Sequence, residues 1–367
     1  MDIFFILYIV VAALAFLDMT TVKNKYIFVM FFGIFIIFLS GIRWETGTDW
    51  EPYYNYFIKN NYMNDFIQDE VHFEIGYAML NFIAKEVFSS YSGLLFLIAT
   101  IIVFLKYFTI YQYAAYPLVG LFINFINFNG DLFPVRQMIA VAICAFAVRY
   151  IIQRNQICFI LFVICAMSFH ISAIIFLPAY YIFYLKIGNK KFVVLLLLSF
   201  VLGNTGGIDS LLNTLLLELS GLDLYSMVKL ADYASFQYTK DMETLGGGGS
   251  LALVLGGLRR GLFVPILLYA REKMNIKYKY YSGLLNLYFI SILVSFLFMG
   301  VLAPLIGRIT IYYFCFEFLL IPSLFLYKNN WCYKILILLI LLIYGVFKFY
   351  WGISMYYEAF VPFKTVF

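Results

Sequence analysis

Four charged side chains stand close together directly after an apolar run that begins near residue 26: Arg43, Glu45, Asp49 and Glu51. A carboxylate within hydrogen-bonding reach of a hydroxyl group can take its proton as the hydroxyl attacks a carbon atom. An arginine can bind a phosphate group through two parallel hydrogen bonds. The stretch therefore predicts one wall of an active site that combines a general base with an anion-binding group.

Further arginines stand at the predicted ends of other apolar segments. With Arg43 they form a group of five: Arg43, Arg136, Arg259, Arg260 and Arg308. Gln137, directly after Arg136, is a further candidate substrate contact. The topology given below places all five arginines on the outer side of a membrane, whereas Lys and Arg normally gather on the cytoplasmic side. We interpret the group as a binding site for a lipid-linked diphosphate at the outer leaflet. For each single arginine, anchoring to lipid headgroups or pairing with Asp131 or Glu74 is the alternative.

The candidates for the general base are three carboxylates and one imidazole: Asp49, Glu45, Glu74 and His170. For Asp49 and Glu45 the alternative is structural pairing with Arg43, and for His170 it is a polar cap at a turn between helices. The acidic and histidine residues match no DxD or HxxxH spacing, so we expect no metal and no cofactor.

Aromatic residues surround the charged stretch, and Tyr53 and Tyr54 follow it directly. Aromatic faces stack on sugar rings, and their polar tips bond hydroxyl groups. Aromatic residues also form ordinary belts at membrane interfaces. Both interpretations stay open at this point, and we retain the two tyrosines as candidate substrate contacts.

The composition restricts the fold that positions these residues. Of the 367 residues, 64% are hydrophobic and 12% are charged, whereas soluble domains carry roughly 25% charged residues. Structures exposed to lipid are helices or closed barrels, and the apolar runs are too long for the alternating strands of a barrel. The chain is therefore predicted to be an all-α polytopic membrane protein. It has no basic tail for nucleic acid.

About 12 transmembrane helices are expected, within a range of 11 to 14, because a span needs about 20 apolar residues and fewer when neighbours bury it. The predicted spans lie near 3–17, 26–42, 92–112, 117–129, 135–152, 156–170, 171–186, 191–204, 253–271, 281–300, 306–327 and 331–347. They form a single integral membrane domain over 1–367.

Lys23 and Lys25 mark the first turn as cytoplasmic, and the later basic clusters agree with this if residues 74–88 do not cross the membrane. The segment 74–88 is then an interfacial or re-entrant helix. The loops 43–91 and 205–250 lie outside, and 208–219 and 222–235 are expected to form amphipathic helices on the membrane surface. A topology in which 74–88 crosses is disfavoured, because it places Arg149 and Arg154 outside.

The stretch from Gly41 to Trp50, with Tyr53 and Tyr54, resembles the G-x-R-x-x-x-G-x-D-x-x-x-Y signature of the EpsG/Wzy-like polysaccharide polymerases. Other segments that resemble the family are Phe73-Glu74-Ile75-Gly76-Tyr77, Arg136-Gln137, Phe169-His170-Ile171-Ser172-Ala173, Gly307-Arg308 with Tyr312-Tyr313-Phe314, and Val361-Pro362-Phe363-Lys364. The resemblance covers nearly the whole chain. The departures are Trp44 and Trp50, where tyrosine is common, and the doubled Arg259-Arg260.

The resemblance implies a metal-independent glycosyltransferase of GT-C-like fold in the bacterial inner membrane, with its active site facing outward. Such an enzyme transfers a growing glycan from undecaprenyl diphosphate to a hydroxyl of another lipid-linked repeat unit. The implied partners are lipid-linked oligosaccharide and membrane lipids, and a chain-length regulator protein is a candidate partner. An O-antigen ligase is the enzymatic alternative. A flippase or transporter is the other alternative, but it would need charges along a mid-membrane path, where Lys106 and Glu317 stand nearly alone.

Overall fold

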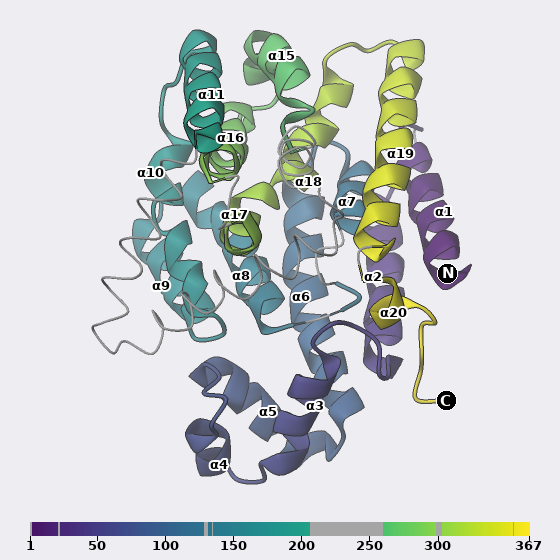
Figure 1. Cartoon of the computed structure of the whole chain (residues 1–367). Coiled ribbons are helices and arrows are strands. Elements are labelled where there is room, and N and C mark those ends of the chain that lie inside the picture. The colour runs from purple at the N-terminus through teal and green to yellow at the C-terminus, as the bar shows by residue number, and fades with distance from the viewer. Residues whose placement is uncertain are drawn as a thin grey trace. The chain divides into compact units, whose positions relative to one another are not determined.

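The computed structural model describes residues 2–20, 23–127, 131–133, 135–205, 260–298, 303–354 and 356–367. Every regular element in these ranges is a helix, and the single β-bridge found there joins Arg43 to Thr365. The all-helical class is therefore confirmed for the described part of the chain (Figure 1).

The chain forms two compact units, which are described separately below. Unit 1 comprises Met1–Tyr180, Lys273–Tyr281 and Cys315–Phe367, and unit 2 comprises Tyr181–Glu272 and Ser282–Phe314. The single domain over 1–367 stays a prediction.

The apolar helices of unit 1 come mostly from the first half of the chain. They are α1 (Asp2–Leu17), α2 (Lys25–Ile42), α6 (Tyr91–Tyr113), α7 (Pro117–Ile126), α8 (Arg136–Ile152) and α9 (Gln156–Met167). Helices α2 and α6 run antiparallel in close contact, because α2 carries glycines where α6 packs. A Cβ on Gly33 would lie 3.1 Å from the Val103 side chain, and one on Gly41 would lie 2.4 Å from the Phe96 ring.

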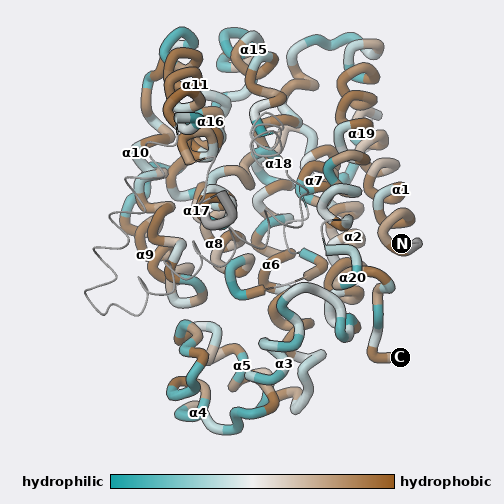
Figure 2. The backbone as a smooth tube through the Cα atoms, in the orientation of Figure 1, coloured by the Kyte–Doolittle hydropathy of each residue, from teal (hydrophilic) through white to brown (hydrophobic). Residues whose placement is uncertain are grey.

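Three shorter helices join α2 to α6: α3 (Trp50–Lys59), α4 (Met63–Gln68) and α5 (Ile75–Phe88). The rest of unit 1 includes η1 (Ile171–Phe176), α18 (Glu317–Leu320), η2 (Ile321–Leu326), α19 (Trp331–Ser354) and α20 (Tyr357–Phe360). Figure 2 shows apolar residues along most of α1, α2 and α19, whereas polar residues are interleaved along the α3–α5 region. This contrast fits membrane-spanning helices capped by an interfacial segment.

Helix α5 begins and ends at one end of the unit 1 helices. At its start, the Gly76 amide donates to the Ser168 carbonyl across 2.7 Å, just after α9 ends. At its other end, Ser89 and Ser90 lead directly into the start of α6. Figure 1 shows α3, α4 and α5 together at one end of α6, α8 and α9, all of which belong to unit 1. This geometry agrees with a segment 74–88 that does not cross.

Unit 2 contains the described parts of the other helices: α11 (Asn189–Asn204), most of α15 (Val264–Lys277), most of α16 (Tyr281–Leu297) and α17 (Ala303–Phe314). The Asn286 amide donates to the carbonyls of Ile182 and Leu185 at 3.0 and 2.8 Å. The α10 helix (Ala179–Phe183), which starts in unit 1, is thereby tied to α16 at its C-terminal end. Gly203 lets α11 lie close to α16, since a Cβ at this position would stand 2.0 Å from the Phe296 carbonyl oxygen.

Four stretches of the described chain are long and apolar enough to cross a membrane: Lys25–Ile42, Tyr91–Tyr113, Ile306–Leu326 and Trp331–Ser354. Several predicted spans are shorter helices, and one is divided at a proline. The segment 171–186 divides into η1 and α10 around Pro178, because proline cannot donate a helix hydrogen bond. The stretch Ile306–Leu326 remains one candidate span, which has a turn at Cys315 and Phe316 and ends in η2. The count of 12 spans stays a prediction. The predicted helices 208–219 and 222–235, and the first part of the span 253–271, lie outside the described residues.

Candidate functional site

The loop after α2, residues 43–49, folds around the side chain of Arg43. The Arg43 side chain is buried, and its Nη1 donates to the Thr46 carbonyl across 2.7 Å. The guanidinium lies 5.3 Å from the centre of the Phe133 ring. Gly47 has a positive φ of 114°, and a Cβ there would lie 2.7 Å from Arg43 Nη1. The loop thus requires glycine at position 47, for both its backbone angle and the space that Arg43 occupies.

Replacing Gly47 with alanine is expected to lower the stability of the protein by about 1–3 kcal/mol, because it adds backbone strain and displaces Arg43. Thermal unfolding of purified protein in detergent measures this. Gly188→Ala is the matched control, since a Cβ at Gly188 meets nothing within 4 Å. An unchanged melting temperature for Gly47→Ala would show that the loop is not held in this conformation.

The C-terminal strap, residues 356–367, holds this loop through backbone hydrogen bonds. Trp44 N donates to Lys364 O at 3.0 Å, and Gly47 N donates to Ala359 O at 2.7 Å. The Lys364 amide in turn donates to Thr46 Oγ1 at 3.0 Å. Glu45 forms an exposed ion pair with Lys364 Nζ at 3.0 Å. Glu45 is therefore a partner of the strap, and the strap rather than Glu45 fixes the path of the loop.

A second charged pair joins α5 to α8. Arg136 is the first residue of α8, and its Nη1 bonds Glu74 Oε2. The other carboxylate oxygen of Glu74 accepts from the Ile171 amide at 3.1 Å. The Arg136 guanidinium also lies 4.4 Å from the centre of the Phe73 ring. Both charged side chains stay partly accessible, with exposed fractions of 24% for Arg136 and 19% for Glu74, so a ligand can reach the pair.

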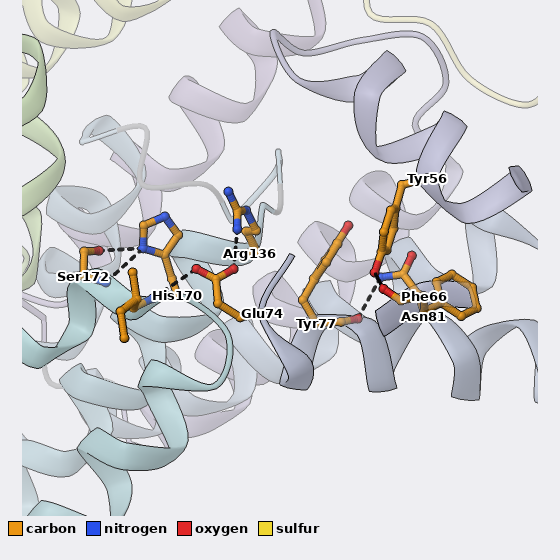
Figure 3. A network of polar contacts seen from close by, with 9 residues as sticks. Tyr56, Phe66, Glu74, Tyr77, Asn81, Arg136, His170 and Ser172 are labelled. Carbon is orange, nitrogen blue, oxygen red and sulfur yellow. Dashed lines mark hydrogen bonds and ion pairs between the residues drawn. The ribbon is translucent and has the colours of Figure 1, made fainter. Parts of the chain in front are cut away.

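His170 lies at the turn that binds Glu74. Its Nδ1 is 2.6 Å from Ser172 Oγ, which fixes the orientation of the imidazole. Figure 3 shows this ring on the same side of the turn as Arg136 and the Glu74 carboxylate. Gln137 follows Arg136 in α8 and is half-buried. His170 thus caps the start of η1, as the alternative interpretation predicted. Its role as a general base stays a prediction.

Tyr53 and Asp49 connect the Arg43 loop with the Arg136 pair. Tyr53 hydrogen-bonds Arg136. Burial raises the pKa of the Tyr53 hydroxyl, the positive charge of Arg136 lowers it, and the negative charge of Asp49 raises it. Burial lowers the pKa of Arg43 to about 10, against nearby Tyr91, Tyr77 and Asp49. Arg43 therefore stays charged at neutral pH. The exposed Asp49 lies within electrostatic reach of both Arg43 and Tyr53.

Tyr54 has a different environment from Tyr53. Its ring stacks on Trp50 at 4.7 Å and packs edge-on against Tyr91 at 5.2 Å. Trp44 completes this aromatic cluster, with its ring 5.1 Å from that of Trp50. The rings thus cover one another, which favours a packing role for Tyr54 and leaves Tyr53 as the tyrosine beside the charged groups.

The remaining arginines of the predicted diphosphate site belong to unit 2. Arg260 Nη1 donates to Ser295 Oγ at 2.7 Å, and its Nη2 lies 3.4 Å from where a Cβ on Gly307 would stand. The next residue, Arg308, is exposed. Arg259 lies outside the described residues. Arg260 and Arg308 are therefore close within their own unit, and their convergence with Arg43 and Arg136 stays a prediction.

Sequence reasoning missed two aromatic residues near this site: Phe133, whose ring lies against Arg43, and Tyr91, which acts electrostatically on Arg43 and packs against Trp44. Their type carries no signal in a chain with 21% aromatic residues. Within the described ranges, no group of three or more His, Cys, Asp or Glu residues is arranged to hold a metal ion.

The comparison with protein families covers nearly the whole chain. A family model described as the EpsG family matches residues 26–365. The chain belongs to the EpsG family. No curated protein and no solved structure matches it. Membership in the EpsG family, with the apolar helices, identifies a multi-pass membrane protein of the exopolysaccharide polymerase type. The matched range includes the Arg43 loop, the Arg136–Glu74 pair and the strap as far as Thr365.

Proposed function

We propose that this EpsG-family protein is a polysaccharide polymerase of the outer face of the bacterial inner membrane. It transfers a growing glycan from undecaprenyl diphosphate to a hydroxyl of another lipid-linked repeat unit. The observation that carries the proposal is the cluster of Arg136, Glu74, Tyr53 and Asp49 at one end of the unit 1 helices. Reactive charges at helix ends suit a substrate whose diphosphate lies at the membrane surface.

The reaction needs a base and a group that stabilises the leaving diphosphate. The acceptor oxygen forms a bond to the anomeric carbon while the bond from that carbon to the diphosphate oxygen breaks. Asp49 takes the proton of the acceptor hydroxyl, because it is exposed and lies beside Tyr53. Arg136 stabilises the negative charge that develops on the diphosphate, and Glu74 holds Arg136 in place through their ion pair.

Arg43 supports this site from within the protein, since its guanidinium is buried and bonded to Thr46. In this proposal its charge attracts the diphosphate at short range, while Arg136 makes the direct contact. Arg308 and Arg260, with Arg259, bind the second lipid-linked diphosphate. The proposal also includes a GT-C-like fold with about 12 spans.

Purified protein reconstituted in lipid vesicles is expected to convert lipid-linked repeat units, extracted from a strain that lacks this gene, into a ladder of longer glycans. Gel electrophoresis of the products checks this. Units that move across the bilayer without being joined would identify a flippase. Transfer of finished glycan to a different lipid acceptor, with no ladder, would identify a ligase. Either result would contradict the proposed function.

A further inference from the structure

A carboxylate that the proposed mechanism does not use lies buried between α7 and α8. Asp131 pairs with Lys106 Nζ of α6 at 2.6 Å and accepts hydrogen bonds from Asn124 of α7 and the Tyr107 hydroxyl of α6. Lys106 is fully buried, and Asp131 is 8% exposed. Three donors from two helices thus converge on one carboxylate.

Stability alone is a weak reason for such a pair. Taking two charges out of water is costly, and replacing a buried ion pair with apolar residues of similar size is often neutral or stabilising. The geometry of the pair, in contrast, is specific, because each donor fixes the carboxylate in one position. A buried pair of this kind indicates that the chain segment around Asp131 has to be held in one position.

The segment that follows Asp131 carries two residues of the unit 1 site. Two positions on, Phe133 covers the Arg43 guanidinium and contacts the strap through Phe360, with ring centres 4.6 Å apart. Five positions on, Arg136 opens α8 and pairs with Glu74. A shift at Asp131 would therefore reach both arginines of the unit 1 site, one through its aromatic cover and one through the chain itself.

We propose that Asp131, held by Lys106, is a positioning residue that sets Arg136 and the aromatic cover of Arg43 for the transfer reaction. This proposal rests on the proposed polymerase function. Displacing a positioned group by about 1 Å can lower a rate about 100-fold. Asp131 thus acts on turnover through Arg136, and it touches no substrate itself.

The test compares two double variants with the wild-type protein. Lys106→Met with Asp131→Asn removes the pair without leaving one buried charge unpaired. The control is Lys25→Met with Asp18→Asn, which removes an ion pair between a buried carboxylate and a partly exposed lysine at the opposite end of α7, where Asp18 Oδ2 accepts from the Leu118 and Val119 amides. Hydrogen–deuterium exchange at residues 131–133 and 135–138 is measured for all three proteins, together with kcat and KM for lipid-linked repeat units.

The Lys106/Asp131 variant is expected to exchange faster at these amides and to lose about 100-fold in kcat with KM within about twofold of wild type. The control is expected to change neither quantity. Unchanged exchange at these amides, or unchanged kcat, would overturn the positioning role. If the wild-type protein itself made no polymer, the proposed function would fall, while the exchange measurement would still decide whether Asp131 anchors this segment.

Discussion

Replacing Asp49 with asparagine is expected to stop chain elongation and to leave single repeat units on their lipid carrier. Asparagine keeps the shape of the side chain but cannot take a proton, so the rate should fall by about 10²- to 10⁴-fold. Asp49 is exposed, lies one turn before Tyr53, and acts electrostatically on Arg43. Its loss should lower kcat far more than it raises KM. Steady-state kinetics on reconstituted protein, with glycan ladders from complemented cells, measure both effects.

Glu51 supplies the matched control. It is an exposed carboxylate in the first turn of α3, two positions after Asp49, and Glu51→Gln should elongate normally. Glu45→Gln should have a small effect as well, because exposed ion pairs such as Glu45–Lys364 contribute about 0–1 kcal/mol. If Asp49→Asn elongated normally while Glu74→Gln or His170→Gln did not, the base would be the residue whose loss stops the reaction.

Much of the fold could be predicted from apolar runs alone. Helices of 16 to 24 residues such as α1, α2, α6 and α19 are apolar on nearly all sides. A run of this kind is therefore predicted to be a membrane helix from its sequence alone. The distribution of Lys and Arg also predicted that the segment 74–88 does not cross the membrane. The position of α5 at one end of the unit 1 helices agrees with this, and the topology itself stays a prediction. The break at Pro178 was missed, because proline within an apolar run either kinks a helix or ends it, and only tertiary packing decides which.

The site could be predicted in part, and the limits have physical causes. Arg136 and Glu74 carry opposite charges at helix ends, so their pairing was an open alternative. The burial of Arg43 could not be predicted, because it depends on Phe133 and on the strap. The strap holds the loop through backbone amides and carbonyls more than 300 positions apart in the chain, and backbone bonds leave no residue-type pattern. Pairing of an arginine with Asp131 was also an open alternative, and the partner of Asp131 is Lys106 instead.

The second large effect is expected at Arg136, where alanine should lower kcat by about 10²- to 10³-fold through loss of charge stabilisation on the leaving diphosphate. Arg136→Lys should be almost as slow, because lysine keeps the charge but lacks the planar fork that binds two phosphate oxygens and stacks on Phe73. Arg149→Lys is the control in the same helix. It retains a cation near the Phe146 ring at the opposite end of α8 and should polymerise normally.

A double variant separates the two roles that Arg136 can have. Arg136→Ala leaves Glu74 without its ion-pair partner, so a loss of activity alone could reflect an unpaired carboxylate. In Arg136→Ala with Glu74→Gln that charge is absent, and the amide oxygen can still accept from the Ile171 amide. If Arg136 stabilises the diphosphate, the double variant stays as slow as Arg136→Ala. If the double variant regained the wild-type rate, Arg136 would serve only to neutralise Glu74, and the diphosphate would have to be bound by other arginines.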